Sequence, residues 1–309
     1  MKLAVLAGGV GGSRFVQALT EVVEPRDVTV IANVGDDLEV HGLHVSPDLD
    51  TLLYTLAGLG DEARGWGRAG ETWNASETIG LLGGQTWFQV GDRDLGLHLV
   101  RTEALRRGEP LSAVTDRLAR AVGLELTLLP ATDDRLRTRL RTPSGEFEFQ
   151  EWFVARGHRD EVDEVVFDGA ETARGAPGVA KALAEADLIA IAPSNPFVSI
   201  APILAVDEIR AALERRRNDV VAVSPLIGGR AVKGPAEAMF RRLAGGTSAG
   251  QVTDCYKGVI GALVIDEADA ADADGVAERG VTPLVTRTLM SDPANARALA
   301  ETVLGLVAA

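Results

Sequence analysis

Short runs of Val, Ile and Leu alternate with helix-forming stretches along most of this 309-residue chain. The run 188–192, Leu-Ile-Ala-Ile-Ala, is apolar on both faces, which is typical of a central strand covered by helices on both sides. Amphipathic periodicity predicts helices over 176–186, 205–217 and 292–307. This alternation predicts an α/β fold with a mainly parallel sheet and helices on both of its faces. The expected strands are 3–7, 28–32, 125–129, 162–167, 188–192, 219–224, 261–265 and 281–285.

The stretch from about 60 to 160 interrupts this rhythm and is richer in Gly, Trp and charged residues. Residues 136–141 alternate at period two, 142–145 have the composition of a turn, and 146–149 alternate again, which predicts a β-hairpin. Internal repeats and low-complexity linkers are absent from the sequence. We therefore expect a single domain over 1–309 with an inserted helical and β-hairpin region.

The charge balance and the single cysteine limit the classes of function. Lys+Arg 31 against Asp+Glu 45 leaves a net charge of −14, which argues against a broad nucleic-acid-binding surface. The first apolar run ends at Gly8, which is too short for a signal peptide, and no apolar run approaches the ~18 residues of a membrane span. One cysteine cannot form an internal disulfide. These features predict a cytoplasmic protein that binds neither nucleic acid nor membrane.

The segment 8–14, Gly-Gly-Val-Gly-Gly-Ser-Arg, follows the first expected strand and precedes a helix expected from Ser13 to Val23. Glycines let backbone amides approach an anion at a helix N-terminus, so the segment favours phosphate binding over a turn without a ligand. The segment differs from a nicotinamide-binding fingerprint, which would have Gly or Ala in place of Arg14 and an acid near Asn33, so NAD is disfavoured. It also lacks the Lys-Ser or Lys-Thr pair that ends a P-loop, so it is not an ATP- or GTP-hydrolysing P-loop. The candidate nucleotide-binding residues here are Gly8, Gly9, Gly11, Gly12 and Ser13.

Four carboxylates follow within fifteen residues, two after the second expected strand and two before the next helix. They are Asp36, Asp37, Asp48 and Asp50. Because Mg²⁺ prefers oxygen ligands, Asp36, Asp37 and Asp50 are candidate metal ligands. Asp48 fits equally well as an acid that caps a helix. Asp50 lies outside the apolar runs, so we expect that its replacement would leave the fold intact.

Two later segments also follow expected strands. The carboxyl ends of parallel strands meet at one edge of a sheet, so Ser194, Asn195 and Ser199 should share a crevice with the glycine segment. The glycine-rich bend 224–235 carries Lys233, a further candidate for nucleotide binding, although its composition also suits a mobile loop.

The segment Gly-Asp-Arg-Asp at 91–94 precedes a helix and is weak evidence by itself. Four tryptophans in the inserted region could stack on a flat ligand, although packing is the more common use of each. They are Trp66, Trp73, Trp87 and Trp152.

Taken in order, six of these segments resemble the 2-phospho-L-lactate transferase family of coenzyme F-420 biosynthesis. They are 7–13, 33–37, 44–51, 91–94, 193–196 and 233–235. The resemblance implies a Rossmann-like, Mg²⁺-dependent transferase that is usually a homodimer. It implies transfer of a phospho-three-carbon-acid group from a guanosine diphosphate-activated donor to the ribityl hydroxyl of 7,8-didemethyl-8-hydroxy-5-deazariboflavin, with release of GMP.

Within this resemblance, Asp50 and Arg93 match the deazaflavin-binding positions, and Asp50 is the candidate catalytic residue. Asp50 could bind the metal, hold the acceptor hydroxyl or accept its proton. The donor carries lactate in archaeal members of the family and enolpyruvate in actinobacterial ones. The Ala- and Arg-rich, Lys-poor composition suggests a GC-rich genome, which favours the enolpyruvyl donor. A non-catalytic nucleotide-sugar-binding regulator of a related glycine-loop family is the alternative, and such a protein would have no deazaflavin for Arg93 to bind.

Overall fold

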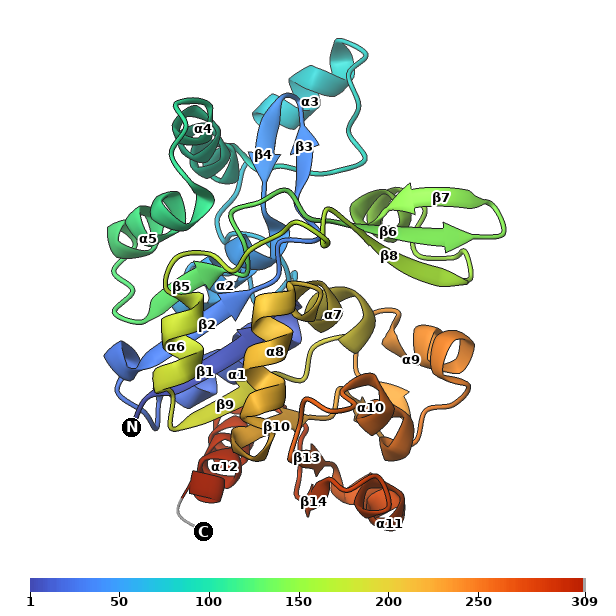
Figure 1. The fold of residues 1–309 in the computed structure, drawn as a ribbon. Helices are drawn as coiled ribbons and strands as arrows, with labels where there is room; N and C mark the ends of the chain where they lie inside the picture. The colour runs from blue at the N-terminus through green and yellow to red at the C-terminus, as the bar shows by residue number, and fades with distance from the viewer. Residues whose placement is uncertain (308–309) are drawn as a thin grey trace.

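A seven-stranded sheet forms the centre of the protein, whose computed structural model describes residues 1–307 (Figure 1). The strand order is β14-β13-β10-β9-β1-β2-β5, and every neighbouring pair is parallel. The strands are β1 (Leu3–Ala7), β2 (Val28–Ala32), β5 (Thr127–Pro130), β9 (Leu188–Ile191), β10 (Val220–Val223), β13 (Ala262–Ile265) and β14 (Thr282–Val285). The predicted Rossmann-like α/β fold is confirmed.

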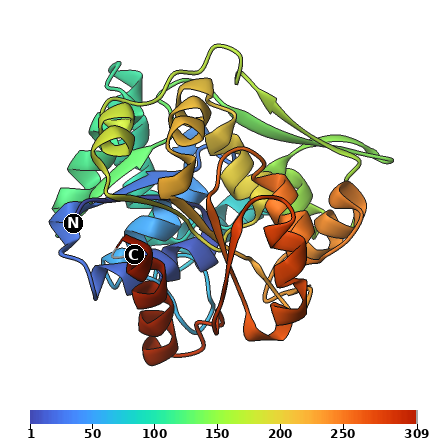
Figure 2. The ribbon, with the colours of Figure 1, turned by 60° about the horizontal axis from the view of Figure 1, so that its bottom comes forward.

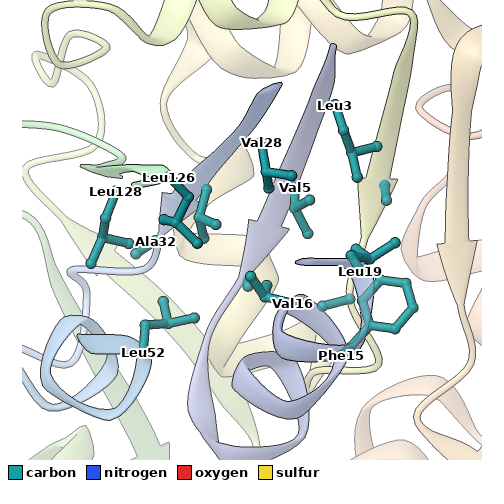
Figure 3. Close-up of a cluster of buried hydrophobic side chains, with 14 of the residues drawn as sticks. Leu3, Val5, Phe15, Val16, Leu19, Val28, Ala32, Leu52, Leu126 and Leu128 are labelled. Carbon is teal, nitrogen blue, oxygen red and sulfur yellow. The ribbon is translucent and has the colours of Figure 1, made fainter. Parts of the chain in front are cut away.

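Alternate residues of the central strands enter two hydrophobic cores, one on each side of the sheet. Val5 lies in the same core as Phe15 and Val16 of helix α1, whereas the next residue of the strand, Leu6, lies in the other core. Figure 3 shows the first core, where the apolar side of α1 faces β1 and β2. Burial on both sides explains why the central strands read as continuous apolar runs.

Helices cover both faces. The first core includes side chains of α1 (Gly9–Thr20), α2 (Pro47–Leu56), α5 (Leu111–Ala121) and α12 (Pro293–Leu304). The second includes side chains of α6 (Val179–Glu185), α7 (Ala201–Leu204), α8 (Asp207–Arg215), α10 (Ala249–Cys255) and α11 (Ala273–Ala277). The C-terminal helix α12 packs against α1, beside the N-terminal part of the chain (Figure 2). Among the helices of residues 1–307, none is both long and apolar enough to cross a membrane.

The predicted hairpin forms, but one predicted strand joins it and not the central sheet. β6 (Arg137–Thr142) pairs with β7 (Gly145–Glu148) and, on its other side, with β8 (Glu164–Asp168), both antiparallel. The expectation that 162–167 is a parallel core strand is therefore wrong. β8 has no fully buried residue, and its Val165 packs against a small separate core that includes Trp152. β5, which also lies within 60–160, belongs to the central sheet.

The remaining elements complete the described chain. Figure 1 shows the β3–β4 hairpin and α3 at the top of the molecule, apart from the central sheet. These elements are β3 (Leu38–Val40), β4 (Leu43–Val45), α3 (Asn74–Leu81), α4 (Asp92–Arg106), β11 (Leu226–Ile227), β12 (Arg230–Ala231) and α9 (Ala236–Met239), with short 3₁₀ or π turns at Pro25–Asp27, Glu151–Ala155, Pro196–Ile200, Arg217–Asp219, Phe240–Ala244, Glu267–Asp272 and Gly305–Val307.

The strand order reverses next to β1. The chain passes from β1 to β2 on one side, and the later strand β9 pairs with β1 on the other. In open parallel sheets ligands bind beyond the carboxyl ends of the strands at such a reversal. The segments after β1 and β9 therefore border the expected crevice.

Candidate functional site

The glycine segment forms the first turn of α1, because this helix begins at Gly9. The expected start near Ser13 is wrong, since glycine's low helix propensity conceals the true N-terminus. Two of the glycines allow close packing: a Cβ on Gly8 would lie 2.3 Å from Asp48 Oδ2, and one on Gly12 would lie 2.6 Å from Ser194 Oγ. Gly9 has a φ of +68° and open space where a Cβ would be.

The segment after β9 meets the glycine segment, as its position at a neighbouring strand end predicted. Ser194 Oγ donates a hydrogen bond to the Gly8 carbonyl oxygen at 2.8 Å. Asn195 Oδ1 accepts from the Phe197 amide at 2.9 Å and so caps the following turn. Ser199 Cβ lies 3.1 Å from the position of a Cβ on Gly8.

Ser13 lies deeper than these residues. It is fully buried, and its hydroxyl donates to the Val10 carbonyl oxygen at 2.9 Å and accepts from Thr55 Oγ1 at 3.1 Å. Its hydroxyl therefore contacts α2.

Asp48 connects the glycine segment to the end of β2. Its Oδ1 accepts from the Gly9 amide at 2.9 Å, and its Oδ2 accepts from Asn33 Nδ2 at 2.9 Å. Asn33 Oδ1 in turn accepts from the Gly35 amide at 2.7 Å. Burial raises the pKa of Asp48 to about 6, although its two hydrogen bonds favour the charged form. Asp48 thus lies in the first turn of α2, but its side chain holds the first turn of α1 and Asn33, contacts that the sequence did not reveal.

The raised pKa of Asp48 predicts how stability changes with pH. Its ordinary value is 3.8, so the folded state binds this proton more tightly than the unfolded state does between pH 4 and 6. The contribution of Asp48 to the free energy of unfolding should therefore decrease as the pH rises through this interval. Urea unfolding of wild type and Asp48→Asn at pH 4, 5, 6 and 7 measures it. The advantage of wild type over the variant should shrink between pH 4 and 6, and an unchanged difference would contradict this assignment.

Asp36 and Asp37 lie beside Asp48, and both are almost fully buried. Within residues 1–307, the Oδ1 atom of each is buried without a hydrogen-bond partner. Burial raises the pKa of Asp36 well above its usual range, and the nearby charges of Asp48 and Asp37 add to this effect. Asp37 Oδ2 accepts from Ser46 Oγ at 2.9 Å and pairs with His44 Nε2 at 2.9 Å.

Asp50 forms a buried ion pair that the sequence did not reveal. Arg101 of α4, which is 2% exposed, binds both of its carboxylate oxygens, with 3.0 Å between Nη1 and Oδ2. The expectation that Asp50 can be replaced without cost to the fold is therefore wrong, because its loss would leave a buried guanidinium unpaired.

A second polar layer extends this pair along the interface of α2 and α4. His98 lies between two carboxylates, with Nδ1 3.8 Å from Asp50 Oδ2 and Nε2 3.3 Å from Asp94 Oδ2. Tyr54 of α2 donates a hydrogen bond to Asp94. Asp94, His98 and Arg101 follow i, i+4, i+7 spacing, which is the signal of a shared helix face that could have been found in the sequence.

Arg93 and Lys233 are exposed, and both contact the glycine-rich loop between α2 and α3. Arg93 Nη1 lies 2.9 Å from the position of a Cβ on Gly70. Lys233 Nζ lies 3.3 Å from the position of a Cβ on Gly65. The structure thus places both cations against this loop, although they come from distant parts of the chain.

The carboxylates fit a magnesium ion only in part. Across residues 1–307, no three His, Cys, Asp or Glu side chains are arranged to hold a metal, and the oxygens of Asp50 are bound by Arg101. Mg²⁺ often uses one or two carboxylates together with substrate phosphates and water. The unpartnered oxygens of Asp36 and Asp37 fit that arrangement.

Comparisons with known proteins agree with the resemblance. Residues 3–289 match the family described as 2-phospho-L-lactate transferase CofD. The phosphoenolpyruvate transferases of Nocardia farcinica and Mycobacterium marinum are each 42% identical, over 94% and 95% of this chain and 90% and 94% of their own. That of Streptomyces griseus is 40% identical over 99% of this chain and 98% of its own.

A solved structure has the same fold. A UPF0052-family protein from Bacillus halodurans superposes with a TM-score of 0.66 at 15% identity, covering 98% of both chains. At this identity the likeness concerns the fold alone. The family match over nearly the whole chain decides the identity: the protein belongs to the 2-phospho-L-lactate transferase CofD family and is a transferase enzyme.

Proposed function

We propose that this transferase acts in coenzyme F-420 biosynthesis. It transfers a phospho-three-carbon-acid group from a guanosine diphosphate-activated donor to the ribityl hydroxyl of 7,8-didemethyl-8-hydroxy-5-deazariboflavin and releases GMP. The observation that carries the proposal is the crevice at the reversal of strand order, where the glycine first turn of α1 meets the buried carboxylates after β2. All three relatives are phosphoenolpyruvate transferases, which supports an enolpyruvyl donor over a lactyl donor.

The first turn of α1 would bind the donor phosphates. The amides of Gly8 and Gly9 are taken by Ser194 and Asp48, but those of Val10 and Gly11 lack partners within the helix because they lie in its first turn. The positive end of the helix dipole lies there as well. These groups are fixed before the donor arrives, so they would stabilise charge on the phosphates without rearrangement.

Three acids near the same turn oppose an anionic donor unless a cation is present. Asp36 and Asp37 would hold Mg²⁺, whose positive charge would offset the negative charge of the donor phosphates. Asp48 already binds the Gly9 amide and Asn33, so it would position the glycine turn. The magnesium ion, the homodimer and the cytoplasmic location remain predictions.

Asp50 would act on the acceptor. Arg101 binds both carboxylate oxygens of Asp50, which leaves them less available to a metal ion, so we favour a role in accepting a hydrogen bond from the acceptor hydroxyl. Phosphoryl transfer depends mainly on positioning and on electrostatic stabilisation, so an oriented carboxylate is sufficient.

The test is a transfer assay with purified protein, Mg²⁺, the deazaflavin and each guanosine-activated donor in turn. Mass spectrometry should detect the phosphoenolpyruvyl or phospholactyl product together with GMP. Binding of a nucleotide sugar without transfer from either donor would favour the regulatory alternative.

Arg93 gives a prediction specific to the acceptor side. Arg93→Ala should raise KM for the deazaflavin about tenfold while the GDP dissociation constant stays within about twofold, because an interaction that stabilises the ground and transition states equally affects KM alone. Steady-state kinetics and calorimetry measure the two constants. Arg107→Ala, which removes an exposed arginine at the other end of α4, is the control and should change neither. A large loss of GDP affinity in Arg93→Ala would place Arg93 on the donor side.

A further inference from the structure

The segment 91–94 begins α4 and is bound there by the loop between α2 and α3. Gly91 is the N-cap residue of the helix and has no side chain to bind the free amides of the first turn. A carboxylate from outside the helix binds two of these amides. Glu71 Oε2 accepts from the Arg93 amide at 2.7 Å, and Glu71 Oε1 accepts from the Asp94 amide at 2.9 Å. Glu71 therefore caps α4 in place of an N-cap side chain, with its negative charge at the positive end of the helix dipole.

The contact with Glu71 explains the glycine at position 91. Gly91 has a φ of −74° and a ψ of 162°, a conformation open to any residue, so the backbone does not require glycine there. A Cβ on Gly91 would, however, lie 2.3 Å from Glu71 Cδ and 2.4 Å from Glu71 Oε2. The missing side chain of Gly91 thus leaves the space that the Glu71 carboxylate occupies.

A second set of hydrogen bonds runs from α4 back to the loop and to α3. Asp92 Oδ2 accepts from Thr72 Oγ1 at 2.6 Å and from the Asn74 amide at 3.1 Å. Asp92 Oδ1 accepts from the Ala75 amide at 3.0 Å. The hydrogen bond from Thr72, together with those from Ala75 and Asn74, lowers the pKa of Asp92 to about 2. Because Asp92 connects the same segments, loss of Glu71 alone would loosen this connection and leave the fold assembled.

This connection also places the loop against the side chain of Arg93. A Cβ on Gly70 would lie 2.9 Å from Arg93 Nη1 and 3.6 Å from Arg93 Cζ, so the loop backbone packs closely against the guanidinium. Arg93 is exposed, and a long exposed side chain without such support samples many rotamers. Since Gly70 directly precedes Glu71, the carboxylate that binds the Arg93 amide also fixes the backbone against which the guanidinium packs.

We infer that Glu71 is a positioning residue for the acceptor, because it fixes both the backbone and the guanidinium of Arg93 in the orientation that binds the deazaflavin. The inference rests on the proposed function, since it takes Arg93 as an acceptor-binding residue. A guanidinium that is fixed before the ligand arrives loses less conformational entropy on binding. Glu71 acts through Arg93 and makes no contact with the acceptor itself.

Calorimetric titration of the deazaflavin and steady-state kinetics test this role in Glu71→Ala. The deazaflavin dissociation constant and KM should both rise about fivefold while the GDP dissociation constant stays within about twofold, because only the acceptor side is released. Glu71→Ala combined with Arg93→Ala should match Arg93→Ala alone, because the first residue acts through the second. Gly91→Ala should reproduce the effect of Glu71→Ala and add nothing to it, because its Cβ displaces the same carboxylate.

Two further variants separate positioning from helix capping. Gly91→Ser added to Glu71→Ala gives α4 an ordinary N-cap, but the deazaflavin affinity should stay low because the loop is still released. Asp272→Ala is the matched control, because Asp272 Oδ2 accepts from the Ala249 amide at 2.9 Å at the start of α10, whose side chains enter the second core. Its deazaflavin affinity should equal that of wild type.

The outcomes distinguish this inference from the proposed function. Three results would each overturn the positioning role: deazaflavin affinity in Glu71→Ala within about twofold of wild type, additive effects of Glu71→Ala and Arg93→Ala, or recovery of affinity on adding Gly91→Ser. Absence of transfer by wild type with either donor would count against the proposed function, whereas the binding constants decide the role of Glu71 without any transfer step. Absence of deazaflavin binding by wild type would overturn both.

Discussion

Asp50→Ala should reduce kcat by about 100-fold or more, because it removes a positioned charge from a phosphoryl-transfer site. The same change should destabilise the fold by about 3–5 kcal/mol, because it leaves Arg101 buried and unpaired. Steady-state kinetics and urea unfolding measure the two effects. Retention of more than about a tenth of wild-type kcat would refute the catalytic assignment.

A double variant separates the two effects. Replacing a buried ion pair by apolar residues of similar volume is often neutral or stabilising. Asp50→Leu combined with Arg101→Met should therefore be far more stable than Arg101→Met alone and yet remain inactive. Recovery of turnover along with stability would show that the pair serves only the fold.

The fold could be predicted largely because its strands are buried on both faces. Complete burial requires an apolar residue at every position, and this produces runs such as 188–192 that stand out without knowledge of their partners. The expected strand 162–167 contains Asp163 and Glu164 among its apolar residues, and the strand that forms there, β8, lies in the small antiparallel sheet and has no fully buried residue. Apolar composition indicates how far a strand is buried but not which strand lies beside it, because that depends on contacts made elsewhere.

The crevice could be predicted for a similar reason, since strand ends locate it. The detailed geometry of the crevice could not be predicted from the sequence. Arg101 lies 51 residues from Asp50 in the chain, and the pair forms only because α4 packs beside α2. Asp48 likewise contacts Gly9 across 39 residues. Such contacts follow from tertiary packing, and a single sequence carries only the helical spacing of each partner.

Gly9→Ala should weaken GDP binding by at least about tenfold while lowering the free energy of unfolding by only about 1–2 kcal/mol, the cost of a left-handed conformation for a residue with a Cβ. No atom lies within 4 Å of the position of that Cβ, so the methyl group would enter the open space assigned to the phosphates. Gly8→Ala should be more destabilising, because its Cβ would lie 2.3 Å from Asp48 Oδ2 and would displace the carboxylate that holds the turn.

Gly123→Ala is the matched control for Gly9→Ala. Gly123 has a φ of +83° and, like Gly9, no atom within 4 Å of its Cβ position, but it lies between α5 and β5. The two substitutions therefore introduce the same kind of backbone strain, and only one of them adds a methyl group at the crevice. Calorimetric titration of GDP in the presence of Mg²⁺ should show a loss of affinity in Gly9→Ala and none in Gly123→Ala. Equal GDP affinities in the two variants would mean that the open space beside Gly9 holds no phosphate, and the donor would have to bind elsewhere.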